Sequence, residues 1–321
     1  MTMKQLAEIA NVSVSTVSKA FSGSREISEE KREYIFEIAK KEGCYDKYCK
    51  PFFKKKVIAV VCPEFHSGYF SSQLAYLKEN IEKHIGVMVA ACYNFDDNSK
   101  NEIISYFTES AKVDGLIVMG SNLPRPSYNT PIVVIGENED FDSISLSIKS
   151  AIKDAIEYLF ENGHTDIAFI GECLTQKKFE GFAAAIEEIG LKINDDLIIE
   201  SKERFEEAGY NAMNLLIEKK KPPTAVIAAY DSIAVGAMKS IYEHGLNIPD
   251  DISLIGMDCN RETAYLNVPL TTITSYNEDL CEIAVNLLFD RMKDKNRSKP
   301  KKIKVSTELI KRKSVGKAKN S

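Results

Sequence analysis

Residues 2–21 read TMKQLAEIANVSVSTVSKAF, and this stretch predicts two short helices joined by a tight break. Thr2 and Gln5 form a capping box, because a glutamine at the third helical position can bond back to the backbone of the capping residue. Asn11 and Val12 interrupt the first helix, and Ser13 caps a second helix over 14–21. The combination is typical of a helix-turn-helix.

The second helix presents short polar side chains on the face opposite its apolar residues Val17 and Phe21. Such side chains near a helix N-terminus fit the major groove, and the free backbone N–H groups of the first turn suit phosphates. From spacing alone, an ordinary capped bundle with solvated serines remains the alternative. The candidate DNA contacts are Ser13, Val14, Ser15, Thr16, Ser18 and Lys19.

Outward from this motif, Ser28 caps a third helix that Gly43 ends, so we expect an all-α unit over residues 1–46. Residues 47–56, KYCKPFFKKK, hold five Lys and no acid, and predict a basic linker.

The composition changes at residue 57, where continuous apolar, β-branched runs begin to alternate with amphipathic helical stretches. This alternation predicts parallel sheets covered by helices, and its length predicts two α/β lobes. The expected strands are 57–62, 87–93, 115–119, 132–135, 167–171, 225–229 and 252–256, and the clearest helices are 149–161, 178–189, 206–219 and 232–244.

Charge is divided unevenly along the 321 residues. The net charge is −5, which taken alone argues against nucleic acid as a partner. Residues 1–56 carry +4, residues 57–290 carry −20 and residues 291–321 carry +11. The positive N-terminal part coincides with the helix-turn-helix and the lysine linker, where phosphates would be met, whereas we expect the basic C-terminal tail over 315–321 to be flexible.

Several function classes are excluded. The sequence has no apolar run long enough to span a membrane and no secretory signal. Seven cysteines stand singly, four histidines share no ligand spacing, and no GxGxxG, GxxxxGK[ST] or GxSxG motif occurs. We expect a cytoplasmic protein without cofactor, metal or catalytic residues, and not an enzyme.

The motif residues resemble the headpiece of LacI/GalR-family bacterial transcription regulators, and further signatures follow in the family's order. They are residues 3–19 (MKQLAEIANVSVSTVSK), 27–32 (ISEEKR) with 41–43 (KEG), 163–171 (GHTDIAFIG), 223–231 (PTAVIAAYD), 248–258 (IPDDISLIGMD) and 269–273 (PLTTI).

The resemblance implies a periplasmic-binding-protein-like core of two doubly wound lobes behind the headpiece. By analogy the core spans 57–314, with an N-lobe at about 57–138 and 274–296 and a C-lobe at about 139–273 and 302–314. It further implies a homodimer that reads a pseudo-palindromic operator in double-stranded DNA.

Effector-binding candidates follow from the resemblance, position by position. The loop after the first strand offers His66, Tyr69 and Phe70, and strand ends and helix starts of the C-lobe offer Phe205, Asp231 and Asp258. Three positions depart from the family: Lys178 stands for the usual Arg, Tyr230 for Asn, and Gly136-Glu137 for Asp-Arg. Lys keeps the charge of Arg but loses its bidentate fork.

The linker is the least family-like segment, because the family's hinge helix inserts a Leu into the minor groove. Here we expect Phe52 or Phe53 to act as the wedge, with Lys54 and the following lysines on phosphates. An extended, solvated linker without intercalation is the alternative.

Together these observations predict a sequence-specific transcription regulator, a repressor, controlled by a sugar or sugar derivative between the lobes. The same regulator controlled by a protein corepressor is the alternative, with an α/β enzyme as a remote one.

Overall fold

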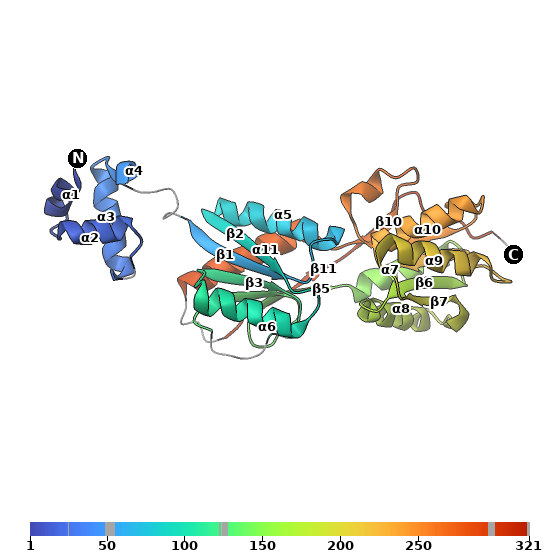
Figure 1. Cartoon of the computed structure of the whole chain (residues 1–321). Helices are drawn as coiled ribbons and strands as arrows, with labels where there is room; N and C mark the ends of the chain where they lie inside the picture. The colour runs from blue at the N-terminus through green and yellow to red at the C-terminus, as the bar shows by residue number, and fades with distance from the viewer. Residues whose placement is uncertain (25, 49–54, 122, 124–127, 295–298, 320–321) are drawn as a thin grey trace.

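The chain folds into an α-helical headpiece and two α/β lobes that follow one another in a row (Figure 1). The computed structural model describes residues 1–24, 26–48, 55–121, 123, 128–294 and 299–319. Within these residues no helix is both long and apolar enough to cross a membrane.

The headpiece consists of α1 (Met3–Ile9), α2 (Val14–Phe21), α3 (Glu29–Lys41) and the short α4 (Tyr45–Tyr48). The predicted caps are present, since Gln5 N donates to Thr2 Oγ1 at 3.3 Å and Thr16 N donates to Ser13 Oγ at 3.0 Å. Asn11 adopts a φ of 50° in the break, a left-handed conformation that asparagine tolerates better than most residues. The helix-turn-helix is therefore fixed by local sequence.

The headpiece extends slightly further than the predicted boundary at residue 46. Tyr48 donates its hydroxyl to Met1 O at 2.6 Å, and its ring lies 5.9 Å from that of Phe21. At the other end of the linker, Lys56 already belongs to β1 and lies 3.2 Å from Asp114. Local packing thus removes residues at both ends from the expected linker of 47–56.

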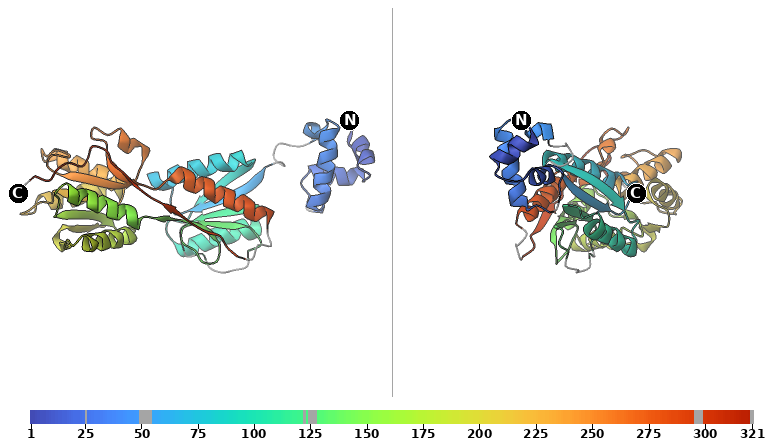
Figure 2. Two further views of the ribbon diagram at one scale, coloured as in Figure 1. Left: turned by 180° about the vertical axis from the view of Figure 1, so that it is seen from behind. Right: turned by 60° about the vertical axis from the view of Figure 1, so that its left-hand side comes forward.

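The N-lobe is a parallel sheet with the order β11-β5-β4-β3-β1-β2 within the described residues. Helices α5 and α11 cover one face, α6 lies on the other, and α6 continues into the π-helical turn η2 (Figures 1 and 2). The bounds are β1 (Lys56–Cys62), α5 (Gly68–Lys83), β2 (Gly86–Cys92), α6 (Asp97–Ser105), η2 (Tyr106–Ser110), β3 (Gly115–Met119), β4 (Ile132–Ile135), β5 (Asp142–Ser147), α11 (Asn277–Lys293) and β11 (Lys302–Ser306).

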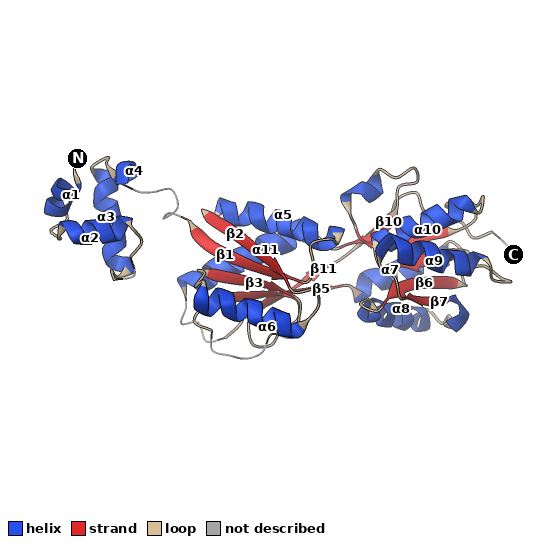
Figure 3. Ribbon diagram, in the orientation of Figure 1, coloured by secondary structure: helices blue, strands red, loops and turns tan. Residues whose placement is uncertain are grey.

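The C-lobe repeats this layering of helices around a sheet (Figure 3). Its strand order is β12-β10-β9-β8-β6-β7, again for the described residues, in which only the β10–β12 pair is antiparallel. Its bounds are α7 (Lys149–Glu161), β6 (Ile167–Glu172), α8 (Gln176–Glu188), η3 (Asp195–Leu197), β7 (Ile198–Ser201), α9 (Phe205–Ile217), β8 (Ala225–Ala228), α10 (Asp231–Glu243), β9 (Ser253–Asp258), η4 (Arg261–Ala264), β10 (Thr271–Thr274) and β12 (Leu309–Ile310). Helices α9 and α10 pack closely together, which brings their N-termini to one edge of the sheet.

The predicted lobe boundaries are wrong in two places. Strands β5 and β11 were expected in the C-lobe, but β5 pairs with β4 and β11 pairs with β5 in the N-lobe sheet. Arg291 of α11 anchors this edge, because its Nη2 donates to Asp142 at 2.7 Å. In the described chain the crossovers between lobes therefore lie at residues 147–149, 274–277 and 306–309.

The expectation of a flexible tail over 315–321 is wrong for residues 315–319. His164 Nε2 donates to Gly316 O at 3.1 Å, and Ala318 N donates to Asn162 O at 2.8 Å. The segment is thus docked on the C-lobe, and Lys319 pairs with Asp251. Other lysines of the basic C-terminal part lie on the edge strand β11, where exposed charge discourages pairing with other chains.

Candidate functional site

The first candidate surface is the outer face of α2. Val17, Ala20 and Phe21 are buried in the headpiece core, so the opposite side of α2 is turned to solvent. Val14 is 45% exposed, so its side chain is accessible to a partner on this face. Of the predicted contacts, Ser13, Val14, Ser15 and Ser18 are exposed, and Thr16 and Lys19 are half-buried.

Lys19 is not free on this face, because its ammonium group pairs with Glu26 in the loop before α3. The pairing lowers the pKa of Glu26. A phosphate or base edge must therefore compete with an acidic side chain for Lys19.

The remaining DNA-binding candidates, Phe52, Phe53 and Lys54, lie outside the described residues.

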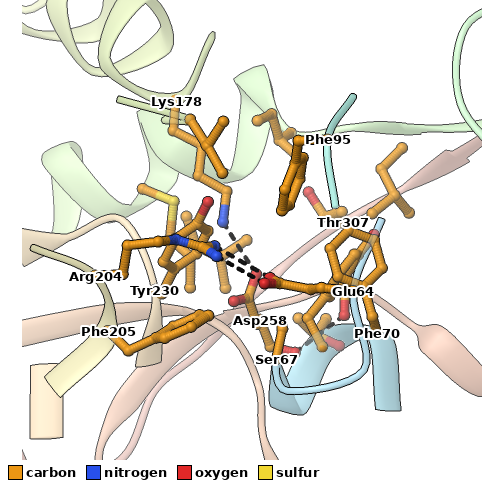
Figure 4. A pocket seen from close by; sticks show the side chains of 18 residues that line it. Glu64, Ser67, Phe70, Phe95, Lys178, Arg204, Phe205, Tyr230, Asp258 and Thr307 are labelled. Carbon is orange, nitrogen blue, oxygen red and sulfur yellow. Dashed lines mark hydrogen bonds and ion pairs between the residues drawn. The ribbon is translucent and has the colours of Figure 1, made fainter. Parts of the chain in front are cut away.

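The second candidate site is a cavity of about 330 Å³ between the lobes (Figure 4). Aromatic side chains form much of its wall, and a small number of charged and hydroxyl groups point into it. The lining residues are Glu64, Ser67, Tyr69, Phe70, Phe95, Leu146, Ile148, Leu174, Lys178, Arg204, Phe205, Tyr230, Met257, Asp258, Ile273, Thr274, Ser275 and Thr307.

Six of the eight predicted effector residues line this cavity, and two do not. His66 is exposed, because Glu64 and Ser67 occupy the buried positions of the loop before α5. Asp231 is fully buried behind the wall. The six residues that the fold brings together are Tyr69, Phe70, Lys178, Phe205, Tyr230 and Asp258.

Lys178 holds Asp258 in place at the C-lobe side of the cavity. Its Nζ donates to Asp258 Oδ1 at 3.0 Å and to Ala229 O at 2.7 Å, and it lies 4.4 Å from the centre of the Tyr230 ring. Burial raises the pKa of Asp258, and Lys178 opposes that rise. Lys178 is thus committed to protein partners, whereas Asp258 retains lone pairs for a ligand.

Arg204 forms the most extensive charged contact of the cavity. Its Nη1 and Nη2 donate to the two oxygens of Glu64 at 2.6 and 3.1 Å, and its Nε lies 3.0 and 3.2 Å from the oxygens of Glu172. Its guanidinium carbon lies 4.3 Å from the Phe205 ring centre and 5.3 Å from that of Phe95.

Asp231 has a positioning role. Its Oδ2 accepts from Asn260 N at 2.7 Å and its Oδ1 accepts from Thr272 Oγ1 at 2.6 Å. Burial, assisted by the nearby charge of Asp258, raises the pKa of Asp231 to about 7. Asp231 therefore fixes the turn that follows Asp258.

Sequence reasoning missed Glu64, Arg204, Phe95 and Thr307. Glu64 lies in the loop that had been singled out, and Arg204 directly precedes Phe205. Their pairing joins residues 140 positions apart, so a pattern along the chain could not reveal it. The available signal was Glu64 itself, an acidic residue two positions after the end of the expected strand over 57–62.

The comparisons with known proteins agree with this architecture. Residues 2–44 match the family described as bacterial regulatory proteins, lacI family, and residues 156–315 match the periplasmic binding protein-like domain. The chain is 33% identical to the HTH-type transcriptional repressor PurR of Histophilus somni (strain 129Pt) over 98% of each protein. It is 32% identical to the repressor of the same name in Escherichia coli O139:H28 (strain E24377A / ETEC), over 98% of this chain and 96% of that protein.

Solved structures share the fold. The transcriptional regulator CelR in its cellobiose complex matches with a TM-score of 0.70 and 21% identity, over 98% of this chain and 99% of that one. A LacI family regulator from Enterococcus faecium with bound ribose matches with a TM-score of 0.73 and 22% identity, over 82% of this chain and 100% of that one.

A helix-turn-helix headpiece on a two-lobed, periplasmic-binding-protein-like core defines the class, a DNA-binding transcription regulator. The 33% identity to such a repressor, which extends over nearly the full length of both proteins, shows that the chain belongs to the LacI family. These relatives confirm the predicted fold class and the prediction of a regulator rather than an enzyme.

Proposed function

We propose that the protein is a homodimeric repressor whose affinity for a pseudo-palindromic operator is set by a small molecule in the cavity between the lobes. The occupant we favour is a sugar or sugar derivative. The proposal includes a cytoplasmic location, since that is where a bacterial operator lies.

The position of the cavity carries this proposal. Leu146 directly precedes the first crossover of the described chain and Ile148 lies within it, Thr274 and Ser275 begin the second, and Thr307 lies in the third. All of them line the cavity, so an occupant contacts the segments about which one lobe turns on the other. In a dimer, a change in lobe angle alters the spacing of the two headpieces and therefore operator affinity.

The chemistry of the wall favours a ligand with a flat apolar face and several hydrogen-bond donors. Aromatic rings from both lobes, including Phe70 and Phe205, offer stacking surfaces, and the Asp258 carboxylate can accept from hydroxyl groups. The matching structures with cellobiose and ribose support a sugar as the class to test first.

A protein corepressor is the alternative. The family departures at Lys178, Tyr230 and Glu137 left it open. Lys178 and Tyr230 line the cavity, which favours a small molecule, whereas Glu137 is exposed outside it.

A thermal-shift screen of sugars, sugar phosphates and purines tests the effector. A compound at 100 times its Kd stabilises the folded state by about 2.7 kcal/mol. Asp258→Asn should abolish that shift, whereas Asp250→Asn, which removes an exposed carboxylate of the same lobe, should leave it intact. The stabilising compound should also change operator affinity about 5- to 150-fold. If no compound stabilises the chain and a protein partner alters operator affinity instead, the corepressor alternative replaces this proposal.

A further inference from the structure

Arg204 joins the two lobes across the cavity. It directly precedes α9 of the C-lobe, and its partner Glu64 belongs to the N-lobe loop between β1 and α5. Figure 4 shows the two side chains pointing toward one another, with both guanidinium nitrogens directed at the carboxylate. This bidentate arrangement is the strongest geometry for an arginine–carboxylate pair.

The contact is partly shielded from water, mainly on the Glu64 side. The Glu64 side chain is 8% exposed and that of Arg204 is 31% exposed. Phe95 from the N-lobe and Phe205 from the C-lobe lie on the guanidinium group, so the aromatic contacts also come from both lobes. Screening by salt is therefore weaker here than at a surface pair.

The two carboxylates that hold Arg204 differ in what lobe movement does to them. Glu172 ends β6, so its contact with Arg204 lies within the C-lobe and survives any change of lobe angle. Glu64 lies on the other lobe, and its contact exists only while the cleft is closed. Glu172 thus keeps Arg204 oriented to capture Glu64 when the lobes approach.

We propose that the Arg204–Glu64 ion pair sets the equilibrium between open and closed lobes in this regulator. Arg204 acts as a positioning residue, anchored by Glu172, and closure is favoured by the protein's own charges in addition to any effector. The step from closure to operator affinity rests on the proposed function, whereas the closure itself does not.

A second interlobe ion pair provides a matched control. Lys177 Nζ of α8 lies 3.6 Å from Glu137 Oε2 of the N-lobe, and these side chains are 77% and 61% exposed. Glu64→Gln and Glu137→Gln each remove one negative charge from an interlobe pair, but only the first removes a buried, bidentate contact. Exposed pairs of the second kind contribute little.

The chain contains no tryptophan, so Phe95→Trp supplies a unique fluorescent reporter beside Arg204. Acrylamide quenching is measured on the full chain with this reporter, alone and combined with Glu64→Gln or Glu137→Gln, without DNA or effector. Glu64→Gln should lower the closed-to-open ratio at least about tenfold and so raise the quenching constant above that of the parent. Glu137→Gln should leave it unchanged.

Small-angle X-ray scattering of the variants without the reporter gives a second measurement, and circular dichroism verifies that each variant is folded. Glu64→Gln should have a larger radius of gyration than the parent, and Glu137→Gln the same radius. Equal quenching and equal radii for parent and Glu64→Gln overturn the proposal. If Glu64→Gln opens the lobes but operator affinity does not change, the inference holds and the proposed control of DNA binding by lobe angle fails.

Discussion

Gly236 lies where α10 crosses α9, and it is the position at which one added methyl group should disturb the cavity from a distance. A Cβ atom built on Gly236 would lie 1.9 Å from Glu206 O, whereas ordinary contacts begin at 3.4 Å. Because the obstacle is backbone, the helices must separate by more than 1 Å to admit Gly236→Ala. Overpacking of this kind costs about 1–3 kcal/mol, and the better helix propensity of alanine returns at most about 1 kcal/mol.

The separation would act directly on the cavity. Arg204 and Phe205 lie at the N-terminus of α9, and Tyr230 and Asp231 lie at that of α10. Moving the helices apart therefore changes the spacing of the residues that hold Lys178, Glu64 and any ligand. We expect Gly236→Ala to lower both the free energy of unfolding and the change in operator affinity that the effector causes.

Gly181→Ala is the matched control, because Gly181 is also inside a helix of the C-lobe. Its added Cβ would meet Ile152 Cδ1 at 2.8 Å, which is the end of a flexible side chain and can move. Urea denaturation followed by circular dichroism should show a loss of about 1–2 kcal/mol for Gly236→Ala and a change within about 1 kcal/mol of zero for Gly181→Ala. Equal effects of the two substitutions would refute the close-packing argument.

Three further predictions concern other parts of the chain. Burial raises the pKa of Asp231 from 3.8 to about 7, so the folded chain binds this proton more tightly than the unfolded chain. The free energy of unfolding therefore falls as pH rises from 4 to 7. Asp231→Asn should flatten that dependence in urea titrations at pH 5 and 7.5. Glu26→Gln should free Lys19 and raise affinity for random duplex DNA. The slope of the logarithm of the binding constant against the logarithm of salt concentration should steepen by up to about one unit. An unchanged slope counts against a phosphate contact by Lys19. Truncation after Ser314 removes the hydrogen bonds of Gly316 and its neighbours. It should destabilise the C-lobe by about 1 kcal/mol for each bond lost, which calorimetry measures. An unchanged melting temperature would mean that the segment is not docked.

The sequence predicted best those elements whose pattern is set by burial. The helical period over 149–161 corresponds to α7, and the continuous apolar run at 115–119 corresponds to β3, which is buried throughout. The residues of β5 (DSISLS) and β11 (KIKVS) were assigned to the wrong lobe. Only β11 is an edge strand and β5 pairs on both sides, and no local pattern of either strand says which sheet it joins.

The cavity was predictable only in part, for a related reason. Tyr69 and Asp258 follow or end strands, so their gathering at the carboxyl edges of two sheets follows from topology. The partnership of Arg204 with Glu64 depends on the tertiary approach of two lobes, and each residue alone resembles an ordinary surface charge. His66 was misplaced because it lies in an exposed bend between β1 and α5, in which Glu64 and Ser67 take the buried positions.

Selection of bound duplexes from a random DNA pool by the full-length protein tests the central claim most directly. A dimer carrying two copies of the α2 face should enrich one pseudo-palindromic sequence, and Ser18→Ala, on the exposed side of α2, should weaken binding to it more than binding to random duplex. The account is contradicted if no sequence is enriched at physiological salt, or if the enriched site is bound equally well after residues 1–48 are removed.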